Sequence, residues 1–420
     1  MRLLFFLFIV GMQGVSQAQT YTIQALEALS IKNYPLLKQA NILNNTAELN
    51  IDNIKKALYP QVSVNGQATY QSDVTSINIP IAGFSPNPLS KDQYRATVDI
   101  QQNIYDGGLN KKMQDVVIAG SKVELLKNEV DIYKLRERVT QIYCSILYTN
   151  EVVKQIDIIN QDLNNALQKV EALLNNGLVF KNNVLQIKAQ LLKNGQKKEE
   201  ALAAKRTLLD AMALLANISI SDKAIFELPV VQFDEMKSTA SIRPEILLFD
   251  AQKNSIETQL ALVDVKTNPK LGAFVQTGFG RPALNMLNND FSWFGIGGLK
   301  LQWSLGGYYT AKKEKTILTN QVKLVQNEKE TYELNNNIQL KQQLDEINKL
   351  EKLLTTDKQI IEIREQIKNT SLVQLNNGVI TANDYLKEIS EFDLANQAFV
   401  QHQTQLIQSK LQYQLIKGKN

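Results

Sequence analysis

Residues 174–179 read Leu-Asn-Asn-Gly-Leu-Val, and the chain repeats this stretch at 375–380 as Leu-Asn-Asn-Gly-Val-Ile. Both copies follow a long helical pattern and precede a shorter one. Asparagine and glycine are typical of the turn that ends a helix, so each copy predicts a helical hairpin. A long-range recurrence of this kind indicates that the chain is a tandem repeat.

A very long helix is predicted before each turn. Gly107 lies 70 residues before Gly177, and Gly306 lies 72 residues before Gly378. In the first interval, apolar residues recur at alternating steps of three and four, which is typical of a left-handed coiled coil. At 1.5 Å per residue, each helix would be on the order of 100 Å long. The heptad residues are Ile132, Leu135, Val139, Ile142, Ile146, Val153, Ile156, Leu163, Leu167, Val170 and Leu174.

Four segments alternate between apolar and polar residues, which predicts β-strands. Each has the length of a strand that spans lipid, about 9–11 residues. Aromatic residues gather near their ends, as in the interfacial belts of membrane barrels. From the pattern alone, a soluble sheet with aromatic core residues is an equal alternative. The segments are 62–71, 94–103, 271–280 and 291–301; the aromatic residues are Tyr70, Tyr94, Tyr105, Phe279, Phe291, Trp293 and Trp303.

If these strands lie in a bilayer, their edges decide the assembly. An unpaired backbone group in hydrocarbon costs several kcal/mol, and four strands cannot close a barrel. Two copies would give eight strands with a filled interior, whereas three would give twelve and leave a passage. A trimer is therefore predicted, with Arg95, Asp99 and Lys300 facing its water-filled interior.

The N-terminus resembles a secretory signal peptide. Met1 and Arg2 precede an apolar run at 3–10, and small residues stand at Ser16 and Ala18. Beyond residue 18, no apolar stretch reaches the roughly 20 residues of a membrane-spanning helix, so the mature chain is soluble or crosses a membrane as strands.

The remaining chain divides into two copies of one plan: helix, two strands, long helix, return helix. The prolines at 35 and 60, and those at 244 and 269, bracket the first helix of each copy. The predicted parts are a signal peptide at 1–18, a first repeat at 19–216, a linker at 217–243 and a second repeat at 244–420.

Composition excludes several classes of protein. The net charge is only +4 and basic residues do not cluster, so no nucleic acid partner is expected. With one cysteine, Cys144, and one histidine, His402, the chain has no catalytic triad and no Cys/His metal cage. We expect no enzymatic activity and no cofactor. Cys144 is predicted to be a small packing residue, and His402 to be a solvated surface residue.

In combination, these features resemble the TolC family of outer membrane efflux proteins. The similarity covers essentially the whole mature chain. Its motifs are the tandem repeat, Asn33-Tyr34-Pro35-Leu36, Arg243-Pro244-Glu245-Ile246, Tyr59-Pro60, Tyr105-Asp106-Gly107-Gly108, Ser304-Leu305-Gly306-Gly307, and the two Asn-Asn-Gly turns with Asn183-Val184-Leu185 and Asp384-Tyr385-Leu386.

The resemblance implies an α+β membrane protein. Its long helices would form an α-barrel in the periplasm, and four strands per chain would close as a twelve-strand β-barrel in outer membrane lipid. A homotrimer of this kind would be the passive exit duct of a tripartite efflux or type I export system. A periplasmic adaptor (membrane fusion protein) and an inner-membrane transporter would dock at the turns, around Asn176, Gly177, Asn183, Asn377, Gly378 and Asn383.

The resemblance also implies a periplasmic gate made by two acidic residues after the second turn. Asp384 matches the first position, but the second is Lys387, which puts a shared acidic ring in doubt. Asp384 also lies near a helix start, where a carboxylate favours the positive end of the helix. The alternative function is a periplasmic coiled-coil scaffold or adaptor without a pore. The transported substrate cannot be read from the sequence.

Overall fold

The computed structural model describes residues 19–75, 89–230 and 243–418. The proposed signal peptide, most of the first strand-to-strand loop and much of the proposed linker lie outside these ranges. The chain forms two compact units: unit 1 comprises 1–38, 130–243 and 333–420, and unit 2 comprises 39–129 and 244–332. These spatial units cut across the two repeats, so the division at 217–243 stays a prediction.

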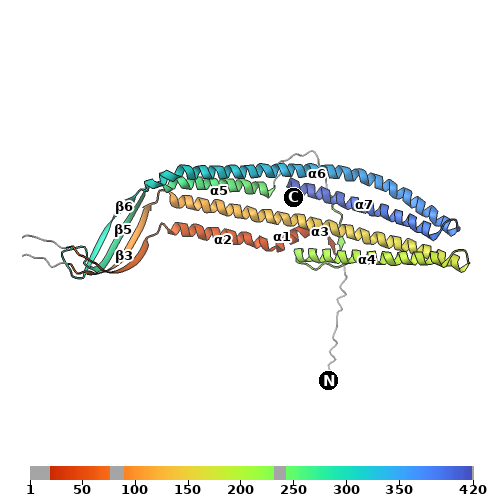
Figure 1. Ribbon diagram of the computed structural model, residues 1–420, viewed down its shortest axis with the longest axis horizontal. Helices are drawn as coiled ribbons and strands as arrows, with labels where there is room; N and C mark the ends of the chain where they lie inside the picture. Colours follow the sequence, from red (N-terminus) through yellow and green to blue (C-terminus); the bar gives the residue numbers. More distant parts are fainter. Residues whose placement is uncertain (1–18, 76–88, 231–242, 419–420) are drawn as a thin grey trace, which may run out of the picture. The chain divides into compact units, whose positions relative to one another are not determined.

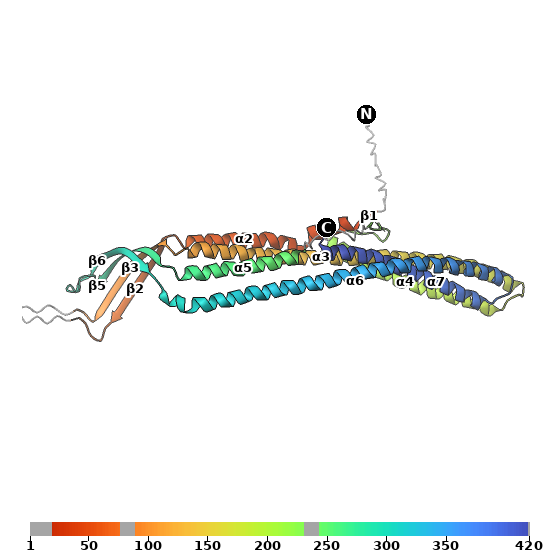
Figure 2. The same cartoon turned by 90° about the horizontal axis from the view of Figure 1, so that it is seen from above.

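Unit 2 contains a four-stranded antiparallel sheet in the order β2-β3-β5-β6 (Figures 1 and 2). All four predicted strands are confirmed, with ends shifted by one or two residues. Both outer strands, β2 and β6, have one edge that no described strand pairs. The bounds are Gln61–Tyr70 for β2, Asp92–Tyr105 for β3, Lys270–Arg281 for β5 and Ser292–Gln302 for β6.

The register separates polar from apolar side chains. Paired residues of antiparallel strands share a face, and Asp99 pairs with both Ser63 and Gln276. Counting by twos from these pairs places most polar strand residues on one face, together with Phe274, Phe294 and Ile296. The opposite face carries Val62, Val64, Ala68, Tyr70, Tyr94, Ala96, Val98, Ile100, Leu271, Ala273, Val275, Phe279, Trp293, Leu299 and Leu301.

Helices continue from the strands in both repeats. α3 has 67 residues and α6 has 69, which confirms the two long helices. The Asp106 carboxylate accepts hydrogen bonds from the backbone N–H groups of Gly108 at 2.9 Å and Asn110 at 2.6 Å, so it caps the start of α3. The bounds are Pro35–Lys56 for α2, Leu109–Asn175 for α3, Pro244–Lys266 for α5, Leu305–Gly307 for the short helix η1 and Tyr308–Asn376 for α6.

The return helices lie in unit 1. α4 (Lys181–Ala216) and α7 (Ala382–Lys417) each have 36 residues and confirm the predicted hairpins (Figure 1). Both turns have the same backbone. Gly177 and Gly378 adopt positive φ angles of 73° and 71°, and the next N–H reaches back to the carbonyl five residues earlier, at 2.9 Å in each copy.

A second part of unit 1 packs around α1 (Ile23–Asn33) and the parallel pair of β1 (Thr20–Tyr21) with β4 (Ile225–Phe226). Tyr143 is fully buried here, with its hydroxyl 2.9 Å from the Tyr21 carbonyl and 2.7 Å from that of Glu227. Cys144 belongs to the same apolar cluster, and burial raises its pKa to about 12. The prediction that Cys144 is a packing residue is confirmed.

The prediction for His402 was wrong. Its Nδ1 lies 2.6 Å from Oδ2 of Asp357, whose exposed fraction is only 7%. The α6–α7 hairpin brings residue 402 opposite residue 357, so the polar run at 401–403 faces a neighbouring helix at this point.

Among the described helices, none has an apolar segment of the length that crossing a bilayer would take.

Candidate functional site

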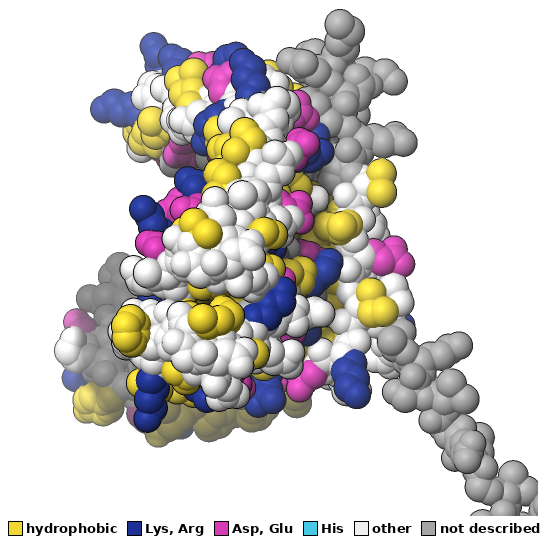
Figure 3. All heavy atoms as spheres, turned by 90° about the vertical axis from the view of Figure 1, so that its right-hand side faces the viewer, with side chains coloured by type: hydrophobic (Ala, Val, Ile, Leu, Met, Phe, Trp, Pro, Cys, Tyr) yellow, Lys and Arg dark blue, Asp and Glu magenta, His cyan; other side chains and the backbone are white. Residues whose placement is uncertain are grey.

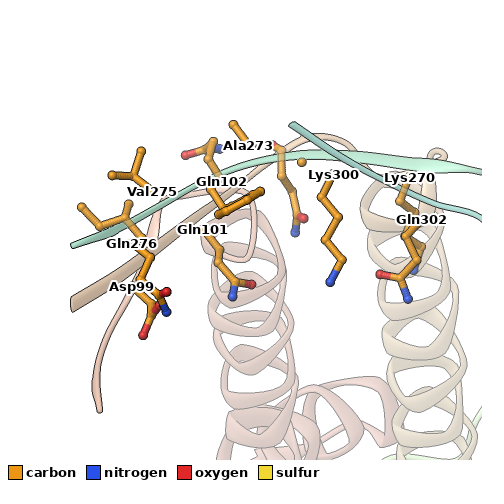
Figure 4. A pocket seen from close by; sticks show the side chains of 13 residues that line it. Asp99, Gln101, Gln102, Lys270, Ala273, Val275, Gln276, Lys300 and Gln302 are labelled. Atoms are coloured by element: carbon orange, nitrogen blue, oxygen red, sulfur yellow. Dashed lines mark hydrogen bonds between the residues drawn. The ribbon is translucent and has the colours of Figure 1, made fainter. Parts of the chain in front are cut away.

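A shallow cavity of about 330 Å³ lies on the polar face of the sheet, at the end where β5 begins and β6 ends. Figure 4 shows side chains of three strands directed to this side, Asp99 and Lys300 among them. The Asp99 carboxylate accepts hydrogen bonds from Asn65 Nδ2 at 2.7 Å, from Thr97 Oγ1 at 2.9 Å and from Gln276 Nε2. Three neutral groups therefore satisfy this carboxylate.

Sequence reasoning placed Arg95, Asp99 and Lys300 together, and all three lie on the polar face. It missed Lys270, whose partner across the strands is Gln302 on that same face. The predicted strand began one residue later, at Leu271, and so did not include this lysine. That these groups line a pore stays a prediction.

The apolar face is open in the single chain. Val64 on the edge strand β2 is 77% exposed and Trp293 on β6 is 76% exposed. Exposed apolar surface of this extent on a sheet indicates a contact with lipid or protein. The face therefore requires a partner that the isolated chain does not provide.

Four of the predicted belt residues meet at one end of the sheet. The ring of Phe279 lies 5.6 Å from that of Phe291 and 5.4 Å from that of Trp293, and Tyr94 lies 6.1 Å from Phe291. Arg281, which sequence reasoning missed, stacks on two of these rings and pairs with Asp92.

Two further belt candidates stand apart from this cluster. Trp303, just past β6 at the opposite end, donates a hydrogen bond to the Thr267 carbonyl at 3.0 Å. Tyr70, the last residue of β2, is 80% exposed. Aromatic side chains thus lie at both ends of the sheet, while their role as membrane belts stays a prediction.

The two helical turns expose apolar side chains. Phe180 is 83% exposed, Val379 is 70% and Leu178 is 68%. Figure 3 shows hydrophobic side chains scattered among charged ones on this side of the molecule. Asn183 is half-buried, and the other predicted docking residues are exposed: Asn176, Gly177, Asn377, Gly378 and Asn383.

Asp384 forms a capping box at the start of α7. Its carboxylate accepts hydrogen bonds from the Thr381 N–H at 3.0 Å and the Thr381 hydroxyl at 2.7 Å, while its own N–H donates to that hydroxyl at 3.3 Å. These hydrogen bonds hold the pKa of Asp384 below its ordinary value, and Lys387 adds to the effect. At the equivalent start of α4, Phe180 provides no side-chain cap.

A buried ion pair joins the long helices. Lys368 on α6 lies 2.7 Å from Asp162 on α3, and their side chains are 10% and 29% exposed. The ammonium group also lies 4.3 Å from the centre of the Phe392 ring on α7. Sequence reasoning missed this contact, because a lysine within a heptad pattern is normally on the surface.

Charged pairs also join α6 to α7. Arg364 contacts Glu388 at 3.4 Å and Glu391 at 3.0 Å, and Lys410 contacts Glu351 at 2.7 Å. Among the described residues, no group of three or more His, Cys, Asp or Glu side chains could hold a metal ion. These polar contacts hold α6 and α7 together.

Comparisons with known proteins gave one family match and several solved structures of the same fold. The sequence model of the outer membrane efflux protein family matches residues 27–218. Comparison with curated proteins gave no match. Several solved structures share the fold over nearly the whole chain.

The outer membrane protein VceC of Vibrio cholerae is 15% identical, with a TM-score of 0.66 over 95% of this chain and 96% of that one. The CmeC outer membrane channel of Campylobacter jejuni is 15% identical, with a TM-score of 0.68 over 94% and 85%. The open state of the MtrE outer membrane channel of Neisseria gonorrhoeae is 14% identical, with a TM-score of 0.67 over 94% and 89%.

Removing one partner of the buried pair should destabilise the helices. In Asp162→Ala, the Lys368 ammonium loses the one carboxylate that pairs with it among the described residues and stays buried, so we expect a loss of about 1–3 kcal/mol of stability. Lys368→Met should lose less, because an apolar side chain of similar length still packs on Phe392.

Thermal unfolding followed by circular dichroism in detergent measures the effect. The control is Glu151→Ala, which breaks an exposed pair with Lys154, where the side chains are 40% and 66% exposed. It should change stability by less than about 0.5 kcal/mol. Equal melting temperatures for Asp162→Ala and Glu151→Ala would contradict a stabilising role.

Proposed function

We propose that the chain is an outer membrane efflux channel of the TolC family and serves as the passive exit duct of a tripartite efflux or type I export system. The observation that carries the proposal is the open sheet. Its two outer strands have free edges, one face is apolar and the other is polar. In a bilayer, such edges must be paired, because hydrocarbon offers backbone groups no hydrogen-bond partners.

The strand directions support closure by identical chains. β2, β3, β5 and β6 alternate in direction, so β6 of one copy can lie antiparallel to β2 of the next. Proteins of this family form trimers, and three copies give a barrel of twelve strands. An eight-strand barrel would be filled by its own side chains, whereas twelve leave room for a passage. The polar face would then line water, and the apolar face would meet lipid.

Two adjacent positions on β2 test this orientation. Val64 lies on the apolar face and Ser63 on the polar face, opposite Asp99. Val64→Lys would place an ammonium group in hydrocarbon, at a cost of about 2–4 kcal/mol near the bilayer midplane. Ser63→Lys would place the same group beside a carboxylate in water. We expect only Val64→Lys to reduce the amount of protein in the outer membrane.

The readouts are the SDS-resistant, heat-modifiable trimer in outer-membrane fractions and ion conductance in planar bilayers. If the two variants assembled equally well, the assignment of the apolar face to lipid and the polar face to water would be wrong. A water-soluble periplasmic monomer, with no conductance, would instead favour the alternative of a coiled-coil scaffold.

We propose further that the turns at Gly177 and Gly378 receive a periplasmic adaptor, and through it an inner-membrane transporter. The support is the exposed apolar group of Leu178, Phe180 and Val379, which no described residue covers. Such groups at the tip of a hairpin suit the end of another coiled coil. A cysteine at Leu178 or Val379 should form cross-links to the adaptor in cells. A cysteine at exposed Leu324, far along α6 from the turn, should not, and equal cross-linking from both would contradict docking at the turns.

Asp384 and Lys387 are our candidates for the charged groups at the periplasmic entrance. Asp384 is exposed, and its lowered pKa keeps it ionised at neutral pH. Asp384→Asn removes the charge while its amide oxygen can still accept the Thr381 N–H. If the charge acts in the gate, block by divalent cations should weaken in this variant, as measured by planar-bilayer conductance.

A structural role would give a different pattern. Thr381→Val breaks the cap but keeps the charge, so it should leave divalent block intact and loosen the start of α7. The pKa of Asp384 is lower in the folded chain than in the unfolded chain. The cap therefore stabilises α7 fully above the unfolded pKa, about 4, and this stabilisation is lost as pH falls through the folded pKa. Divalent block that is unchanged in Asp384→Asn would remove Asp384 from the gate.

A further inference from the structure

We propose that the polar face of the sheet is an attraction site for anionic solutes at the end formed by Lys270 and Lys300, so that the channel favours anions over cations. The inference rests on the proposed function, because this face must line the pore. The ligand class is small carboxylates, phosphates and inorganic anions.

The register brings the two lysines together. Lys300 pairs with Gly272, and Lys270 pairs with Gln302, so the lysines are diagonal neighbours on one face. Diagonal neighbours in a sheet lie about 7–8 Å apart, within reach of a single bound anion for long side chains. Figure 4 shows both side chains directed to the same side of the sheet.

Glycine keeps the space beside the lysines open. Gly272 carries no side chain opposite Lys300, and Gly298 lies two residues before it on β6. A Cβ at Gly272 would lie 3.2 Å from the Gln102 carbonyl oxygen, and one at Gly298 would lie 3.2 Å from the Phe274 ring. The cavity of about 330 Å³ is large enough for an anion with part of its hydration shell.

The nearby carboxylate does not neutralise the lysines. Asp99 takes its hydrogen bonds from Asn65, Thr97 and Gln276, which are all neutral. Among the residues that the structure describes, no ion pair joins it to Lys270 or Lys300. Both ammonium groups therefore remain available to a solute.

The balance of charge on the face is positive. Each chain contributes Arg95, Lys270 and Lys300 against one carboxylate, Asp99, a net of +2. In the proposed trimer, the lysines would form a ring of six at one level of the pore. Rings of Lys or Arg side chains make pores selective for anions, because a wall of low dielectric concentrates their field.

The other side chains on the polar face at this level are the amides of Gln101, Asn103 and Gln302 and the ring of Phe274. Amides donate hydrogen bonds to anions and do not compete for the lysines as carboxylates would. At the periplasmic entrance, Asp384 and Lys387 cancel in formal charge, so that candidate gate would not oppose the preference. The lysine ring therefore has the larger effect on the sign of selectivity.

The test measures reversal potential for the full-length trimer in a planar bilayer across a KCl gradient. The two ions have similar mobilities, so the sign of the potential reports the preference directly. We expect the parent channel to favour chloride. The Lys270→Gln/Lys300→Gln variant should lose most of this preference, and Asp99→Asn should increase it.

Two additions sharpen the test. Inorganic phosphate should reduce the current of the parent channel more than that of the double variant. Raising the KCl concentration should weaken the chloride preference, because salt screens the lysines. The matched control is Lys91→Gln, which removes a lysine one residue before β3 begins, at the other end of the sheet from Lys270 and Lys300, and should leave the reversal potential unchanged.

An open channel that favours potassium, or a double variant with the reversal potential of the parent, would overturn the inference while leaving the pore itself intact. Absence of any conductance from correctly assembled trimers would overturn the proposed function and the inference with it. SDS-resistant trimers of each variant must be present in equal amounts before the potentials are compared.

Discussion

The structure depends on the free backbone edges of β2 and β6. A strand edge presents a row of N–H and C=O groups, and in lipid each unpaired group costs several kcal/mol. A single chain with four strands cannot meet this demand, whatever the quality of its helices. The even number of alternating strands lets a second copy continue the same pattern. In a membrane, an incomplete sheet of this kind would require specific assembly with further copies, and that assembly would carry the long helices.

The two halves follow one plan but differ where polar groups matter. The turns at Gly177 and Gly378 share their backbone conformation, yet only the second leads into a capping box, at Thr381 and Asp384. α6 carries two buried polar contacts, the pair of Asp357 with His402 on α7 and that of Lys368 with Asp162 on α3. Breaking a buried pair leaves an uncompensated charge, so these contacts fix how α6 packs on α7 and α3.

Much of the fold could be predicted from local signals. Proline and glycine predicted helix ends, the period of two predicted all four strands, and the heptad pattern predicted a long coiled-coil helix. Contacts such as Lys368 with Asp162, or His402 with Asp357, could not be predicted, because they depend on which residues of separate helices face one another. The heptad pattern makes such residues look solvated. The role of Arg281 could not be predicted for the same reason, since its partner Asp92 lies on another strand. The polar face was predictable in outline, whereas Lys270 fell just outside the expected strand.

The pairing of β3 with β5 has a consequence for how the wall is built. Each chain supplies two hairpins, and the seam between them has the same antiparallel form as the seam that β6 can make with β2 of a neighbour. A closed wall of three chains would thus be a ring of six like units in which every second joint is covalently tethered. Six separate hairpin chains could form the same backbone hydrogen bonds between neighbouring strands. Tethering them in twos halves the number of free bodies that must meet, and so reduces the translational and rotational entropy lost when the ring closes.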